Sequence, residues 1–274
     1  MDLDISSTIK LNNQIKMPIF GLGTWLLKGK SVYNAVLWAL DSGYSLIDTA
    51  SFYGNESAIG DALKDTKMER EEIFITTKVW NTEQGYENTL EAFKNSLQRL
   101  KLDYIDLYLM HWPVSDLRNE TWRALEKIYE EGGVRAIGVS NFTIRHLNEL
   151  LESSNSVPTV NQIEFSPFLY QKDLMEYCQS KNIAVEAYTP LTRGRKFKNK
   201  VVVNLSQKWG KTPAQILIRW GLQHNIIEIP KTGSKEHLIE NADVFDFNLD
   251  NDDMSRLDNL NENYRVVDDP HSIR

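Results

Sequence analysis

The 274-residue sequence has a single cysteine, no long apolar run and fewer basic than acidic residues. Cys178 alone excludes an intramolecular disulfide, and its place in a helical pattern predicts a small core residue. No apolar stretch approaches the ~20 residues that span a bilayer. None follows the acidic N-terminus either, so we expect no membrane span and no signal peptide. We therefore expect a cytoplasmic protein.

The acidic character of the chain limits its possible partners. The formal net charge is −7 and the isoelectric point is near 5.4. Nucleic acids and anionic membranes bind basic surfaces, so neither is expected as the main partner. We expect a monomer or weak oligomer.

Short apolar runs alternate with amphipathic helical stretches along the whole chain. The runs are rich in Val, Ile and Leu, as is typical of parallel strands covered on both faces. Strands are expected at residues 19–21, 45–47, 73–78, 104–110, 134–139, 160–163, 184–188 and 226–229. Helices are expected at residues 32–40, 89–100 and 121–131, after Asn141 with Thr143 as its cap, and at Thr212-Pro213.

Eight strand candidates in a chain near the ~250 residues typical of the architecture predict an α/β fold, a (β/α)8 TIM barrel. An open doubly wound sheet is the alternative, but Gly21-Leu22-Gly23-Thr24-Trp25 lacks the third glycine of a G-x-G-x-x-G motif. Residues 8–11 and 14–17 flank Asn12-Asn13, which predicts an N-terminal β-hairpin capping the bottom of the barrel. No linker or repeat is visible, so we expect one domain over residues 1–274.

Four titratable residues lie at positions where expected strands end and loops begin: Asp48, Tyr53, Lys78 and His111. The active site of such a barrel lies at the C-terminal ends of its strands, so all four should face one mouth. We expect Lys78 to lower the pKa of Tyr53 and Asp48 to hold Lys78 charged, which makes Tyr53 a general acid/base. His111 would orient a substrate oxygen.

Each of these residues also has an ordinary structural interpretation. Asp48 and Lys78 could form a structural ion pair, His111 could be a satisfied histidine, and Tyr53 could be a turn tyrosine. Their joint placement favours catalysis. No metal site is expected, because the five histidines show no paired ligand spacing.

The motifs around these residues resemble those of the aldo-keto reductases over nearly the whole chain. The matching segments are Gly21-Leu22-Gly23-Thr24-Trp25, Asp48-Thr49-Ala50, Tyr53-Gly54-Asn55-Glu56, Lys78-Val79-Trp80, Met110-His111-Trp112-Pro113, Arg135-Ala136-Ile137-Gly138-Val139-Ser140-Asn141-Phe142, Asn161-Gln162, Ala187-Tyr188-Thr189-Pro190-Leu191 and Ile229-Pro230-Lys231-Thr232. The resemblance implies an oxidoreductase that reduces aldehydes or ketones to alcohols by hydride transfer from NADPH. It identifies Tyr53 as the general acid and implies no metal and no flavin.

The resemblance also implies how the cofactor binds. Ser140, Asn141 and Gln162 would hold the nicotinamide carboxamide, while Tyr188 stacks on the ring. The residues expected near the ribose and the pyrophosphate are Gly23, Thr24, Asp48, Thr189, Leu191 and Arg193. Those expected at the adenosine end are Lys231, Thr232, Ser234, His237, Glu240 and Asn241.

Two departures from the family pattern concern the cofactor. His237 stands where the family usually has an arginine for the 2′-phosphate, and a neutral histidine cannot replace that charged fork. We expect NADPH as cofactor, with NADH possible. Thr192 replaces a glycine that commonly follows Pro-Leu.

The expected substrate pocket is aromatic and open. Its wall would consist of Trp25, Phe52, Trp80, His111 and Trp112, which stand beside the catalytic motifs. This composition suits aldehydes and small ketones with an apolar part. Two other functions remain open: a cofactor-binding regulatory subunit with little turnover, and an unrelated barrel hydrolase or isomerase.

Overall fold

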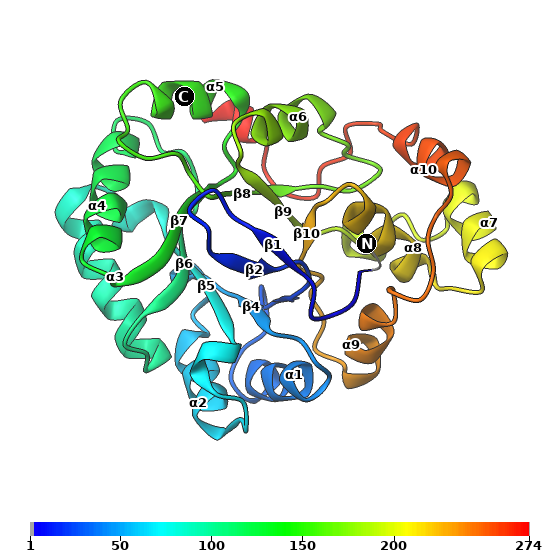
Figure 1. Cartoon of the computed structure of the whole chain (residues 1–274), viewed down its shortest axis with the longest axis horizontal. Coiled ribbons are helices and arrows are strands. Elements are labelled where there is room, and N and C mark those ends of the chain that lie inside the picture. Colours follow the sequence, from blue (N-terminus) through cyan, green and yellow to red (C-terminus); the bar gives the residue numbers. More distant parts are fainter. Residues whose placement is uncertain (1–2, 274) are drawn as a thin grey trace.

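The computed structural model describes residues 3–273, and it has the (β/α)8 architecture expected from the sequence (Figure 1). Parallel strands β3 to β10 lie side by side in chain order. Isolated parallel bridges from Phe20 to Glu228 and from Gly23 to Lys231 join the first strand of this series to the last. The strands are β1 (Thr8–Lys10), β2 (Lys16–Pro18), β3 (Leu22–Gly23), β4 (Leu46–Asp48), β5 (Phe74–Val79), β6 (Ile105–Met110), β7 (Val134–Ser140), β8 (Val160–Glu164), β9 (Ala184–Tyr188) and β10 (Ile227–Glu228).

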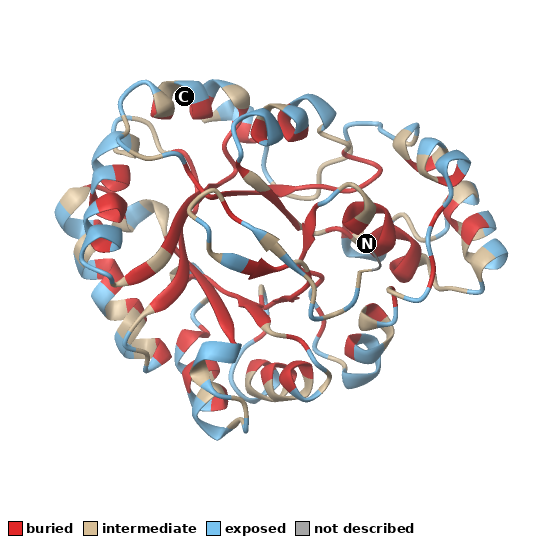
Figure 2. Ribbon diagram, viewed as in Figure 1, coloured by how far each residue is buried: buried red, intermediate tan, exposed pale blue. Residues whose placement is uncertain are grey.

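Helices surround this sheet and bury their apolar faces against it (Figures 1 and 2). They are α1 (Lys30–Asp41), α2 (Glu56–Asp65), α3 (Tyr86–Leu100), α4 (Arg118–Glu130), α5 (Ile144–Leu151), α6 (Lys172–Ser180), α7 (Lys200–Trp209), α8 (Pro213–Gln223), α9 (Lys235–Ala242) and α10 (Asn251–Asp258). The hydroxyls of Thr143 and Thr212 cap α5 and α8, as the sequence predicted. Among residues 3–273, no helix has the length and apolar character that a membrane crossing requires.

The interior of the barrel is apolar at one end and polar at the other. Leu46 and Val160 belong to an inner cluster that is separate from the core under the helices. Side chains two positions apart on a strand share a face. Asp48 and Gln162 therefore stand one layer nearer the C-terminal ends, inside the same barrel.

The N-terminal hairpin closes the apolar end. Strands β1 and β2 pair antiparallel, and Leu11 and Met17 are buried in the inner cluster. The Asn12 and Asn13 amides donate to the backbone oxygens of Pro158 and Arg135. The turn is longer than the expected two residues, because Gln14 also belongs to it and has a positive φ of 73°.

The sequence placed the first barrel strand too early. We expected residues 19–21, but regular pairing covers Leu22–Gly23, and Phe20 contributes only an isolated bridge. At the other edge, β10 covers Ile227–Glu228 instead of residues 226–229.

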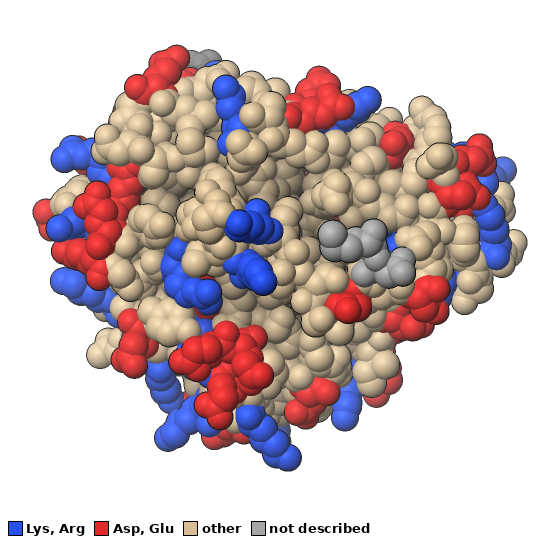
Figure 3. Space-filling model, viewed as in Figure 1, with Lys and Arg blue, Asp and Glu red and all other residues tan. Residues whose placement is uncertain are grey.

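On the face of the molecule shown in Figure 3, acidic and basic side chains are interspersed around the outer edge.

Candidate active site

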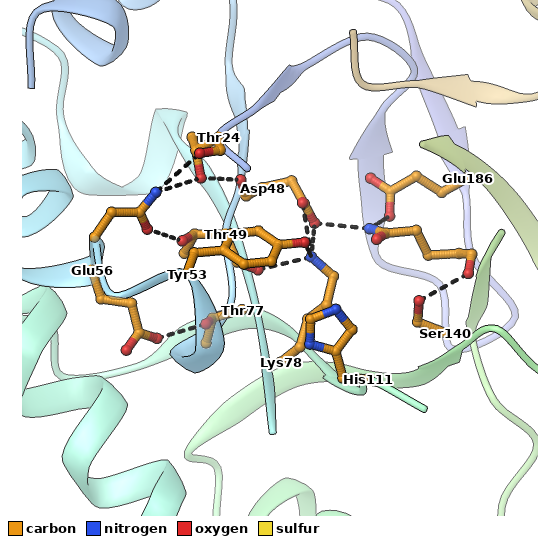
Figure 4. Close-up of polar contacts among 12 residues, drawn as sticks. Thr24, Asp48, Thr49, Tyr53, Glu56, Thr77, Lys78, His111, Ser140 and Glu186 are labelled. Atoms are coloured by element: carbon orange, nitrogen blue, oxygen red, sulfur yellow. Dashed lines mark hydrogen bonds and ion pairs between the residues drawn. The ribbon is translucent and has the colours of Figure 1, made fainter. Parts of the chain in front are cut away.

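Asp48, Lys78 and Tyr53 meet at the C-terminal ends of β4 and β5 (Figure 4). The Lys78 ammonium is fully buried and donates to both carboxylate oxygens of Asp48, at 2.8 Å each. It also donates to the backbone oxygen of Thr49 at 2.8 Å and lies 3.4 Å from the Tyr53 hydroxyl. The amine and the phenol are thus held in contact by a buried ion pair.

The loop that carries Tyr53 is fixed by Asn55. Tyr53 ends a short 3-10 turn, Ser51–Tyr53. The Asn55 amide donates to the backbone oxygens of Thr24 and Leu27 at 3.0 Å each, and accepts from the Thr49 hydroxyl at 2.6 Å. Asn55 lies within a motif that is visible in the sequence, but nothing in its spacing shows that it joins two loops, so no role was predicted for it.

The pKa of Tyr53 is raised well above its usual value, not lowered as we expected. Burial is the main cause; the negative charge of Asp48 adds to it, as does that of Glu186 once Glu186 is ionised. The sequence showed that an ammonium would be near, but it did not show that burial and two carboxylates outweigh that charge. Tyr53 therefore carries its proton at neutral pH, as a proton donor must.

His111 follows β6 and faces the Tyr53 ring edge to face, with ring centroids 5.7 Å apart. Its side chain is buried, and among the described residues its Nδ1 has no hydrogen-bond partner. Burial first, and then the Lys78 charge, lower the pKa of His111 well below its usual value. The imidazole is therefore neutral and can donate one hydrogen bond without bringing a charge.

The predicted aromatic residues form a continuous wall beside this group. Phe52 stacks on Trp80 with ring centroids 3.7 Å apart and on Trp25 at 5.5 Å. Phe52 is 47% exposed, whereas Trp112 is buried. The stack is open to solvent on one side.

Glu83 fixes one edge of the aromatic wall. Its carboxylate accepts the Ser51 hydroxyl at 2.6 Å and the Trp80 backbone N–H at 3.1 Å. Glu83 was missed in the sequence because it stands alone in a polar loop.

The residues expected at the nicotinamide also converge. Asn141 has a left-handed backbone (φ 64°), and its amide donates to the His111 backbone oxygen at 3.0 Å. The Tyr188 hydroxyl donates to Asn141 Oδ1 at 2.6 Å. The Ser140 hydroxyl donates to the Gln162 backbone oxygen at 3.0 Å (Figure 4). At the end of β3, next to Gly23, the Thr24 hydroxyl donates to the backbone oxygen of Asp48 at 2.8 Å.

Glu186 is a buried carboxyl that the sequence analysis missed. It lies in the middle of β9, two residues before Tyr188, and is fully buried. Burial, together with the Asp48 charge, raises the pKa of Glu186 to about 8. A carboxyl inside an otherwise apolar strand was the signal that could have revealed it.

The loop after β9 contains strained threonines. Thr189, Thr192 and Arg193 all have positive φ, of 51°, 49° and 52°. The Thr192 hydroxyl is buried and, within residues 3–273, has no hydrogen-bond partner. This conformation accounts for the glycine that the family prefers there. Arg193 is exposed, and Leu191 is half-buried.

The residues expected at the adenosine end lie in the segment after β10 and on α9. Lys231 and His237 are exposed, Thr232 and Asn241 are buried, and Glu240 is half-buried. Ser234 caps α9 by accepting the His237 backbone N–H at 3.3 Å. Its hydroxyl donates to Glu236 at 2.6 Å. Glu236, which the sequence analysis did not consider, thus places a carboxylate among the residues expected to bind a phosphate.

The chain belongs to the aldo/keto reductase family, whose model matches residues 20–262. It is 47% identical over 274 residues to the glyoxal reductase of Bacillus subtilis (strain 168), an alignment that covers 100% of this chain and 99% of the relative. An aldo-keto reductase from a Medee basin deep-sea metagenome library has a similar structure, with 48% identity and a TM-score of 0.94 over 95% of this chain and 97% of that chain. The Bombyx mori aldo-keto reductase, solved in complex with NADP, is 35% identical, with a TM-score of 0.90 over 96% of this chain and 95% of that chain.

Proposed function

We propose that this protein reduces aldehydes and small ketones to alcohols with NADPH, and that Tyr53 is the general acid. The observation that carries the proposal is the contact between the protonated Tyr53 hydroxyl and the Lys78–Asp48 ion pair at the mouth of the barrel. Membership in the aldo/keto reductase family and the reductase relatives support carbonyl reduction as the reaction class.

The residues of the mouth fit a nicotinamide dinucleotide. Ser140, Asn141 and Gln162 supply amide and hydroxyl groups within one buried cluster, beside the Tyr188 ring. The buried Thr192 hydroxyl, which has no hydrogen-bond partner among residues 3–273, lies in the loop expected at the pyrophosphate. A relative solved with NADP supports the choice of cofactor. When bound, the reduced cofactor supplies a hydride to the carbonyl carbon.

Tyr53 and His111 act on the carbonyl oxygen. The neutral imidazole of His111 donates a hydrogen bond that orients the oxygen. The Tyr53 hydroxyl gives its proton to the oxygen as negative charge develops there. The buried Lys78 ammonium stabilises the phenolate that remains, because its interaction with a new negative charge is strong away from water.

We propose that Lys231 and the N-terminus of α9 select the 2′-phosphate of NADPH. Lys231 supplies a charge, and the first backbone N–H groups of a helix attract anions. His237 and Thr232 complete this set, and Asn241 and Glu240 hold the adenine. His237 instead of arginine predicts that NADH is also used.

The open aromatic wall supports small substrates. Phe52, Trp25 and Trp80 offer an apolar surface exposed on one side, which suits short aldehydes and dicarbonyl compounds. The name of the Bacillus subtilis relative, glyoxal reductase, points the same way.

Turnover of the purified protein tests the proposal. NADPH absorbance should fall when glyoxal, methylglyoxal or an aromatic aldehyde is added, and should fall more slowly with NADH at the same concentration. If NADPH binds but no aldehyde or ketone in the panel is reduced, the regulatory-subunit alternative is correct. If neither nucleotide binds, the proposed function is wrong.

A further inference from the structure

Glu186 belongs to the barrel interior and not to the core under the helices. Its neighbours two positions away on β9, Ala184 and Tyr188, pack against the inner cluster, whereas Val185 and Ala187 lie in the outer core. Alternation along a strand therefore points Glu186 inward, to the polar layer that contains Asp48 and Gln162.

Gln162 connects the two buried carboxyl groups. Its amide nitrogen lies 2.8 Å from Asp48 Oδ2 and 2.7 Å from Glu186 Oε2. An amide nitrogen has two hydrogens, so both are engaged. The amide group then has only its carbonyl oxygen left for another partner.

This arrangement determines how Gln162 meets a ligand. Asp48 alone would engage one hydrogen and leave the other free to turn toward the cofactor. With Glu186 as a second acceptor, the side chain is held from two strands, β4 and β9. A carboxamide beside Gln162 must then donate its own N–H to the Gln162 oxygen.

We propose that Glu186 is a positioning residue for the nicotinamide end of the cofactor, which it orients by holding the amide of Gln162. The proposal rests on the proposed function, because it assumes that a nicotinamide binds at Ser140, Asn141 and Gln162. In this role Glu186 acts through Gln162 and not on the reacting atoms.

The proton on Glu186 adds a pH dependence to this role. The charged groups that act on Glu186 are Asp48 from β4 and Lys78 from β5, and Glu186 in turn acts on Tyr53. From the adjacent strands, β8 contributes the neutral Gln162, and β10 contributes Ile227 as the register partner. With a pKa of about 8, Glu186 is neutral at pH 6.5 and ionised at pH 9.

Ionised Glu186 should favour the oxidised cofactor. The nicotinamide ring of NADP⁺ is positively charged and that of NADPH is neutral, so a nearby carboxylate stabilises NADP⁺ selectively. The ratio of the dissociation constants of NADP⁺ and NADPH should therefore fall about threefold or more between pH 6.5 and 9. Both nucleotides carry the 2′-phosphate, so titration of that phosphate and of groups near it cancels in the ratio.

Two substitutions separate positioning from titration. Glu186→Leu removes the acceptor and leaves a Gln162 N–H unpaired, so NADPH binding should weaken about tenfold. Glu186→Gln keeps an acceptor oxygen and cannot ionise, so binding should return to within about threefold of the native protein. In Glu186→Gln, the ratio of the dissociation constants of NADP⁺ and NADPH should not change with pH.

Glu228 offers a matched control. It is fully buried on the next strand, and burial raises its pKa, but it faces α8, where its carboxylate lies against Gly221. Glu228→Gln should therefore leave the affinity for NADPH unchanged. The fall in the ratio of the NADP⁺ and NADPH dissociation constants between pH 6.5 and 9 (the pH step) should also stay as in the native protein.

Fluorescence titration of the folded variants with NADPH and NADP⁺ gives each constant directly. Native affinity in Glu186→Leu, or a pH step that persists in Glu186→Gln, would overturn the role of Glu186. The pH dependence measured in Glu186→Gln still tests the proposal even if Glu186→Leu does not fold. Neither result affects turnover of the native protein, so a failure of this inference is distinct from a failure of the proposed function.

Discussion

The two ends of the expected cofactor site differ in how they are built. At the nicotinamide end, Asp48, Lys78 and Gln162 are buried and joined by hydrogen bonds of 2.8 Å. At the phosphate end, Lys231 and His237 are exposed. The first end is preorganised before any ligand binds, whereas the second offers exposed side chains that a ligand can recruit.

This difference separates the consequences of substitution. If the proposed function is correct, a change at Asp48 or Lys78 should remove catalysis and also leave a buried charge without a partner. A change at the phosphate end should alter affinity and cofactor choice but not the chemical step. In order of decreasing expected effect, Lys78→Met, His237→Arg and Glu236→Gln test this contrast, and Thr192→Gly tests the loop after β9.

Lys78→Met should have the largest effect. It removes the charge that stabilises the Tyr53 phenolate, so turnover should fall at least ~100-fold. It also leaves the buried Asp48 carboxylate unpaired, which should lower the free energy of unfolding by about 3–5 kcal/mol. Steady-state kinetics and denaturant unfolding measure the two effects. A variant that loses stability but keeps its rate would mean that the ion pair is only structural.

His237→Arg should improve NADPH binding without changing turnover at saturation. Arginine offers a phosphate a permanently charged fork, but at this exposed position the gain should be about 1 kcal/mol, near fivefold in affinity. NADH binding should not change, because NADH has no 2′-phosphate. Titration with both nucleotides measures the difference.

Glu236→Gln gives a second measure of the phosphate end. It removes the carboxylate that accepts the Ser234 hydroxyl and should strengthen NADPH binding by a smaller factor. If neither His237→Arg nor Glu236→Gln alters NADPH affinity, the phosphate binds elsewhere.

Thr192→Gly should have the smallest effect, a gain in stability. The β-branched side chain at φ 49° is strained, and its buried hydroxyl has no partner among the described residues. Glycine removes both the backbone strain and the unpartnered hydroxyl, so the free energy of unfolding should rise by about 1 kcal/mol. The corresponding rise in Tm is roughly 2–4 °C. Thr212→Gly, at a threonine that caps α8 with ordinary φ, should lower Tm instead. A lower Tm in Thr192→Gly would show that the strain is not significant.

The sequence predicted the fold and the meeting of Asp48, Tyr53, Lys78 and His111, because polar residues at the ends of apolar runs are visible as a pattern. The direction in which the pKa of Tyr53 is shifted could not be predicted, since it depends on burial and on the carboxyl groups of Asp48 and Glu186. Glu186 itself was missed because strand alternation, and not spacing, brings it next to Gln162. The first strand was misplaced because Phe20 is as apolar as a strand residue yet makes only an isolated bridge.

Tyr53→Phe tests the central claim most directly, because it removes one hydroxyl from the preorganised end and leaves the rest of the site intact. NADPH affinity should stay within about twofold of the native value, while turnover should fall at least ~100-fold. Tyr33→Phe, which removes an exposed hydroxyl bound to Asp65, is the control and should change neither. Near-native turnover in Tyr53→Phe would contradict the account.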